Sequence, residues 1–253
     1  MQSPVAFVSS MFNVAGGLGY HWAALRFRRT LWAPYTLQVA AILQQWPTTA
    51  AHLVIVGPSA GWHLNPEFLG RFIQVTAIEP DPIARWLLRW RFPLVNWRFD
   101  TSDYFTPYGS HNWTDNTLRL LHNYPDAAVL FANFLGQFIG LYPHAVTQEH
   151  HAELLESPTF SRWKLALTAA LSQRSWLSLH DRLSSDHPPA LAQIDTTNAQ
   201  SSAQLEQAFW PENAQTIDHL TAGIGGAGQR RFVVWQRKPM MFHVIEAIGD
   251  RNQ

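Results

Sequence analysis

Residues 52–62 read HLVIVGPSAGW, and this stretch decides the fold. The run at residues 52–56 is short, apolar and rich in Val, which is typical of a strand buried on both faces. The small residues Gly57, Ser59 and Gly61 that follow allow the backbone to turn tightly and to approach a ligand closely. We therefore expect a parallel strand that ends in a ligand-binding loop, with a plain turn as the alternative.

Further short apolar runs recur along the chain, with helical stretches between them. The expected strands cover residues 52–56, 72–78, 95–99, 127–132, 175–179, 231–236 and 241–247. The last two runs are separated by a short turn and are typical of an antiparallel hairpin. Strands that alternate with helices imply right-handed βαβ units. The pattern predicts an α/β fold with a doubly wound, mainly parallel seven-stranded sheet that ends in a C-terminal antiparallel hairpin.

The chain is expected to divide into two parts. Residues 1–50 are predicted to form an N-terminal helical extension, because apolar residues follow a helical period up to Trp46 and Pro47. Residues 51–253 form the α/β domain. Within it, residues 190–207 are polar and small, which indicates a surface insertion or loop.

The second expected strand ends in Glu79, Pro80, Asp81 and Pro82. Asp81 is a favourable N-cap and Pro82 is suited to the first turn of a helix. Glu79 lies 22 residues after Gly57, a separation at which an acidic side chain can bind both hydroxyls of a ribose. Because ligands bind beyond the carboxyl ends of the strands in such sheets, the loop and Glu79 together predict a nucleoside site.

Over about residues 50–250 this arrangement resembles the class I S-adenosylmethionine-dependent methyltransferases. That family has a small-residue loop after its first strand and acidic residues after its second and third strands. The resemblance implies a Rossmann-like fold, S-adenosylmethionine as the cofactor, and contacts to its methionine, ribose and adenine parts. The cofactor-binding residues implied in this chain are Gly57, Pro58, Ser59, Gly61, Glu79, Pro80, Asp103 and Tyr104.

Some of these assignments have alternatives. Asp100 competes with Asp103 for the adenine amino group, because the end of the third strand is uncertain by a few residues. Ser59 stands where the family's loop has its middle glycine, and Ile55 stands where the family has an acid that contacts the methionine amino group. A dinucleotide-binding G-x-G-x-x-G loop fits less well, since it would need glycine at Ser59 and at Trp62.

The methyl acceptor leaves no clear motif, because in-line methyl transfer depends mainly on orientation and a general base is optional. Asn133 follows the fourth strand, where it either orients a substrate or caps the next helix with Gln137. His180 follows the fifth strand, where it acts as a base or makes an ordinary polar contact. Asn133 and His180 are the candidate catalytic residues.

No metal site is predicted. The chain has no Cys, which excludes thiolate ligands and nucleophiles. His150 and Glu153 would share one helix face but lack a third ligand, so a solvated helix start explains them better. His187 and the pair Asp218 and His219 have no partner that the sequence identifies.

The charge balance argues against a long nucleic-acid partner, since 18 Lys and Arg residues match 18 Asp and Glu residues. No signal peptide or 18-residue apolar stretch is evident, which favours a cytoplasmic protein without a membrane span.

The aromatic content of 13% is consistent with a ligand pocket, a homodimer or a partner protein. Side chains of the N-terminal extension either cover the pocket or pack against the sheet, namely Tyr20, His21, Trp32 and Tyr35.

The sequence thus leads to two functional hypotheses. The first is methyl transfer from S-adenosylmethionine to a small-molecule or peptide acceptor. The second is a methyltransferase-like domain that has lost catalysis and acts as a binding or assembly subunit.

Overall fold

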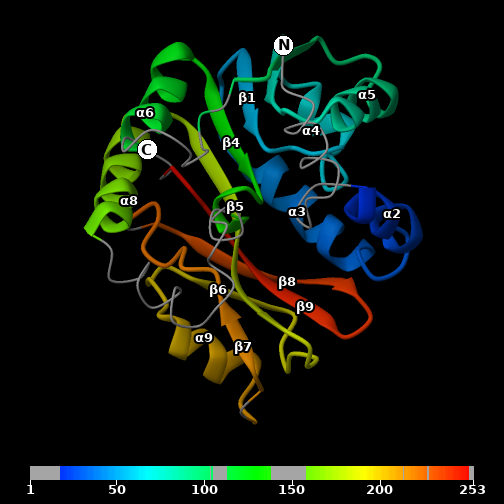
Figure 1. Cartoon of the computed structure of the whole chain (residues 1–253), viewed down its shortest axis with the longest axis vertical. Coiled ribbons are helices and arrows are strands. Elements are labelled where there is room, and N and C mark those ends of the chain that lie inside the picture. Colours follow the sequence, from blue (N-terminus) through cyan, green and yellow to red (C-terminus); the bar gives the residue numbers. More distant parts are fainter. Residues whose placement is uncertain are drawn as a thin grey trace.

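The computed structural model describes residues 18–102, 104, 113–137, 158–212, 214–226 and 228–250. They form one mixed sheet with helices on both faces (Figure 1). The helices are α2 (Leu18–Phe27), α3 (Ala33–Gln45), α4 (Pro66–Leu69), α5 (Pro82–Arg91), α6 (Trp113–Asn123), η1 (Leu135–Gln137, a 3-10 helix), α8 (Pro158–Leu171) and α9 (Ser202–Phe209). The strands are β1 (His52–Val56), β2 (Gln74–Ile78), β3 (Trp97–Asp100), β4 (Ala128–Ala132), β5 (Trp176–Ser185), β6 (Gln193–Thr196), β7 (Thr216–Asp218), β8 (Arg230–Lys238) and β9 (Met241–Gly249).

The parallel half of the sheet has β1 at its centre. The strand order is β3-β2-β1-β4-β5-β9-β8-β6, and β3, β2, β1, β4 and β5 run parallel. In β1, Leu53 and Ile55 belong to the hydrophobic core on one face of the sheet. Val54 and Val56 belong to the core on the opposite face. This burial on both faces explains why the strand is a continuous apolar run.

The antiparallel half is larger than expected. β9 lies between β5 and β8 and is antiparallel to both, as a C-terminal hairpin requires, and the turn places Met240 at φ 57°. Within the described residues the sheet has nine strands rather than the predicted seven, because the short strands β6 and β7 pair with β8 and β5. Of the surface insertion or loop predicted at residues 190–207, the loop was wrong, because this largely exposed segment contains β6 and most of α9.

Two helical layers cover the sheet, and a smaller core completes it. Helices α2 to α5 pack on one face and α6 and α8 on the other, as Figure 1 shows. Helix α9 adds the third core, against β5, β8 and β9. Ser201 and Gln204 form a capping box that explains where α9 begins.

The predicted N-terminal helices are part of the main core. In α3, Tyr35 stacks on Trp235 of β8, with ring centroids 5.3 Å apart. Just before α3, the indole of Trp32 donates a hydrogen bond to the carbonyl of Arg237 at 3.0 Å. None of the described helices combines the length and apolar character needed to cross a bilayer.

Candidate functional site

The loop after β1 has an unusual backbone. Gly57, Ser59 and Gly61 all have positive φ angles, of 64°, 49° and 62°. A side chain added at Gly57 would place its Cβ 2.5 Å from the ring of Phe134, so only glycine fits there. The amide of Gly61 donates to the carbonyl of Pro58 at 2.8 Å, which closes a tight turn. The expected turn-forming loop is thus present, and its glycines are explained by backbone shape and close packing.

Glu79 lies at the end of β2 and ties that strand to the loop. Its carboxylate accepts hydrogen bonds from the amide of Ser59 at 2.8 Å and from the amide of Asp81 at 3.0 Å. Burial raises the pKa of Glu79 to about 7, although both amide hydrogen bonds act in the opposite direction. Glu79 is therefore a buried acid at a strand end, as predicted, beside the exposed residue Pro80.

The end of β3 places an acid next to Glu79. The amide of Glu79 donates to the carbonyl of Asp100 at 3.0 Å. The Asp100 carboxylate accepts hydrogen bonds from the hydroxyls of Tyr104 at 2.7 Å and Tyr124 at 2.8 Å. Burial alone would raise the pKa of Asp100, but these bonds and those from Ser102 lower it. Tyr104 thus lies at the predicted edge, whereas Asp103 lies outside the described residues.

Asn133 follows β4, the strand next to β1. It is buried and has a φ of 57°, and its backbone amide donates to the carbonyl of Leu179 at 2.8 Å. Within the described part of the chain, Asn133 Oδ1 has no hydrogen-bond partner. Asn133 therefore does not use this oxygen to cap η1. The side chain of Gln137 lies outside the described residues.

Helix α2 docks on the loop that carries the small residues. His21 accepts a hydrogen bond from the indole of Trp62 at 3.2 Å, and its Nε2 lies 3.6 Å from the carboxylate of Asp81. Tyr20, one residue earlier, is buried close enough to Glu79 and Asp181 for both charges to act on it, and burial raises its pKa. The N-terminal extension thus covers this edge with Tyr20 and His21 and packs on the sheet with Trp32 and Tyr35.

His180 does not lie at a strand end, and that prediction was wrong. β5 continues to Ser185, and His180 pairs in register with Glu246 of β9. His180 is fully buried, with Nε2 3.4 Å from the carboxylate of Glu246. Glu246 also binds the guanidinium groups of Arg182, at 2.6 Å, and Arg230. His180 therefore belongs to a buried ion-pair network between strands.

The sequence does not reveal a second polar cluster. Asp181, His219 and His243 come from three segments, and one possible ligand atom from each lies within 4.8 Å of the others. Burial would raise the pKa of Asp181, but the neighbouring His243, His219 and Arg237 hold it well below its usual range. Burial lowers the pKa of His219. In the sequence, only the adjacent pair Asp218 and His219 was noticed. The sequence does not show which strands pair, so it does not show that Asp181 and His243 lie beside His219.

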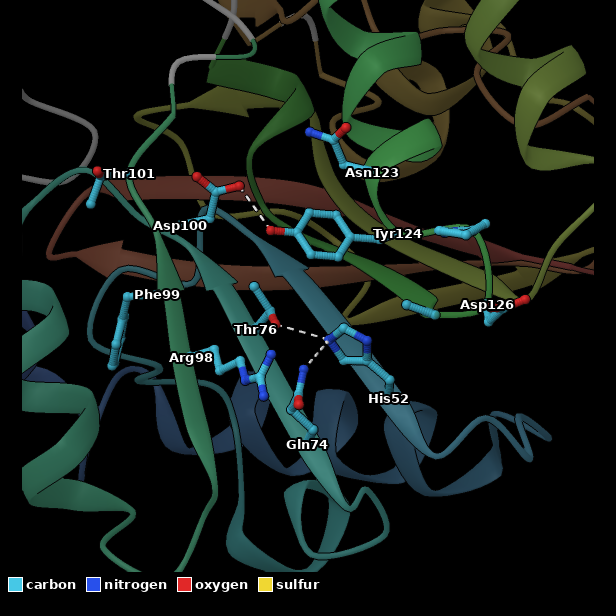
Figure 2. Close-up of a pocket in the computed structure, with 12 residues that line it drawn as sticks. His52, Gln74, Thr76, Arg98, Phe99, Asp100, Thr101, Asn123, Tyr124 and Asp126 are labelled. Carbon is cyan, nitrogen blue, oxygen red and sulfur yellow. Dashed lines mark hydrogen bonds between the residues drawn. The ribbon is translucent and has the colours of Figure 1, made fainter.

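A polar cavity of about 590 Å³ lies on one face of the sheet, over β1, β2 and β3. His52 is hydrogen-bonded to Thr76 at 2.9 Å and to Gln74 at 3.1 Å. Figure 2 shows these bonds, with Arg98 beside them. The cavity reaches the carboxyl edge at Asp100 and Thr101 but does not include the loop after β1 or Glu79. It therefore shares Asp100, the alternative adenine contact, with the predicted nucleoside site but is separate from Glu79 and the loop after β1.

No protein-family model and no curated protein matches the chain. It is similar to the solved structure of a DhpI–SAM–HEP complex, at 13% identity and a TM-score of 0.40, over 97% of this chain and 99% of that chain. It is also similar to the N-methyltransferase NodS from Bradyrhizobium japonicum WM9 in complex with S-adenosyl-L-homocysteine, at 9% identity and a TM-score of 0.41, over 87% of each chain. A third is magnesium protoporphyrin IX methyltransferase (ChlM) from Synechocystis PCC 6803 with bound SAM, at 12% identity and a TM-score of 0.42, over 100% of this chain and 99% of that chain.

Proposed function

We propose that this protein is a methyltransferase of the class I type that binds S-adenosylmethionine at the carboxyl edge of β1 and β2. The observation that carries the proposal is Glu79, a buried acid at the end of β2, hydrogen-bonded to the positive-φ loop after β1. An acid in this position is suited to bind ribose hydroxyls. Each carboxylate oxygen receives one backbone amide and keeps a lone pair for a ligand hydroxyl.

Two unpartnered polar atoms support a ligand at this edge. Ser59 Oγ and Asn133 Oδ1 are buried and have no hydrogen-bond partner in the described part of the chain. They follow β1 and β4, which are neighbouring parallel strands. An unsatisfied buried polar group costs about 1–3 kcal/mol. A polar ligand between the two strand ends would satisfy both atoms and recover this free energy.

The residues of this edge would position the reactants. When bound, the cofactor supplies a methyl group on an activated sulfonium carbon, so orientation is the main requirement of the reaction. Glu79 would hold the ribose, Ser59 the methionine carboxylate, and Asn133 would orient the acceptor. Phe134, which packs over Gly57, would turn away to admit the methionine end.

The acceptor that we propose is a small molecule or a peptide. The chain has 18 basic and 18 acidic residues, and binding a long nucleic acid normally requires a basic surface. We also propose that the protein acts in the cytoplasm.

Calorimetric titration with S-adenosylhomocysteine tests the proposal. At about pH 8, where Glu79 is ionised, we expect saturable binding near one ligand per chain. Glu79→Gln should weaken it about 10- to 100-fold, because a hydrogen bond to a charged group is lost. Glu67→Gln is the matched control, since Glu67 is an exposed acid on α4. NAD serves as the control ligand.

Two results would count against the proposal. One is no binding of S-adenosylhomocysteine by folded wild-type protein, which would favour a role as a binding or assembly subunit. The other is equal affinity in the Glu79→Gln and Glu67→Gln variants. Circular dichroism confirms that each variant is folded.

A further inference from the structure

Asp181, His219 and His243 form a compact cluster of side chains that can bind a metal. One possible ligand atom from each residue lies within 4.8 Å of the other two. Asp181 and His243 expose only 5% and 6% of their surface, and His219 is less buried. None of these residues is among the contacts proposed for the ribose.

The fold brings the three residues together through an irregularity in β5. The pairing of β5 with β9 shifts register between Asp181 and Leu183, so that Ser184 lies opposite His243. The amide of His219, directly after β7, donates to the carbonyl of Arg182 at 3.0 Å. The register shift therefore brings a carboxylate from β5 against imidazoles from two other segments.

The distance between Asp181 and His243 suits a shared ion. Asp181 Oδ1 and His243 Nδ1 are 2.9 Å apart. Ligands with metal bonds of about 2.0–2.2 Å lie roughly 3 Å apart when they meet at near-tetrahedral or octahedral angles. The same distance suits a hydrogen bond, so it permits an ion without requiring one.

The surroundings of the histidines favour a ligand. His219 Nδ1 lies 3.3 Å from the carbonyl of Gly136, and Nε2 lies 3.0 Å from Ser184 Oγ. A ring nitrogen that donates to a backbone carbonyl is the usual way in which a metal-binding histidine is oriented. His243 faces Asp181 with Nδ1, so Nδ1 is the ring nitrogen that would bind the ion. Gly136 also permits this close approach, since a Cβ there would lie 2.8 Å from Asp181 Cβ.

We propose that Asp181, His219 and His243 bind one divalent transition-metal ion. Two imidazoles and one carboxylate, without a thiolate, suit Zn²⁺, Co²⁺ or Fe²⁺. Three protein ligands leave coordination positions for water or another oxygen ligand. Arg237 is close enough to act electrostatically on Asp181, so it opposes the binding of a cation and lowers the affinity.

Metal titration of the chelator-treated full chain tests this proposal. We expect one Co²⁺ per chain with new visible absorption bands, and one Zn²⁺ per chain by calorimetry. His219→Ala is expected to weaken binding about tenfold or more, since it removes a ligand. Zn²⁺ should raise the melting temperature of the wild type but not of this variant.

His187→Ala is the matched control because His187 pairs with Asp186 at 2.6 Å on the exposed surface. It should bind metal like the wild type. His219→Ala is preferred to His243→Ala because His219 is less buried, and circular dichroism confirms its fold. Absence of Co²⁺ bands in the wild type, or equal affinity in wild type and His219→Ala, would overturn the proposal. The cluster would then be only a hydrogen-bonded network that joins the strands.

Discussion

Glu79 is the residue on which the functional account depends, and its environment has a consequence for stability. Burial raises its pKa from an ordinary value of 4.5 to about 7. The native protein therefore holds a proton on Glu79 at pH values where the unfolded chain has lost it. The stability contributed by the protonated carboxyl is fully present below pH 4.5 and is lost as the pH rises through about 7.

Glu79→Gln removes this titration. We predict that the free energy of unfolding of the wild type, minus that of Glu79→Gln, falls by up to about 3 kcal/mol between about pH 4.5 and pH 8. Urea unfolding of both proteins at several pH values measures this difference, and the other titrating groups largely cancel in the subtraction. A difference that does not change with pH would contradict the raised pKa of Glu79.

Gly57 is the second residue with a measurable role. Gly57→Ala adds a side chain at a φ of +64° and places its Cβ 2.5 Å from Phe134. Gly223→Ala is the matched control, because Gly223 has a φ of +84° and nothing within 4 Å of the added Cβ. We predict losses of about 1–2 kcal/mol for Gly223→Ala and about 2–4 kcal/mol for Gly57→Ala. Equal losses in urea unfolding would show that Phe134 does not pack on the loop as described.

At the scale of secondary-structure elements, β5, β8 and β9 are joined by charges buried inside the sheet. Glu246 of β9 binds Arg182 of β5 and Arg230 of β8, and all three side chains are at most 1% exposed. The network's charges and hydrogen bonds lower the pKa of Glu246 to about 2, against the effect of burial. Removing one member leaves buried charges without a partner, which is costly in a medium of low dielectric constant.

We therefore predict that Glu246→Gln lowers the free energy of unfolding by about 3–5 kcal/mol. Asp195→Asn is the control, because Asp195 pairs with Arg231 at 2.9 Å on the surface. Surface pairs of this kind contribute about 1 kcal/mol or less. Urea unfolding near neutral pH measures both. Similar losses for the two variants would contradict the claim that the buried network holds the antiparallel half together.

At the scale of the whole molecule, the parallel half was predictable and the antiparallel half was less so. The strands β1, β2 and β4 are apolar runs buried on both faces, and the N-cap Asp81 binds the amide of Ile83 at 2.8 Å as predicted. The polar segments QIDT and TID of β6 and β7 resemble loops because both strands are short and partly exposed. Their assignment depends on pairing with distant strands.

The site was predictable where it depends on local order and not where it depends on distant pairing. Glu79 and the loop after β1 follow directly from two neighbouring strands and their spacing. His180 was placed after a strand because the apolar run ends at Leu179. In the structure β5 continues to Ser185, and His180 and Arg182 pair with Glu246, which lies 66 residues beyond His180. The cluster of Asp181, His219 and His243 depends on the same pairing of β5 with β9, which no local pattern reveals.

The most direct test of the central claim is a crystal structure of the full chain with S-adenosylhomocysteine. We predict that the ribose hydroxyls bind Glu79, that Ser59 and Asn133 gain polar partners, and that Phe134 moves away from Gly57. The result that would contradict this account is a ligand bound only in the cavity beside His52 and Arg98, with the Glu79 edge unchanged.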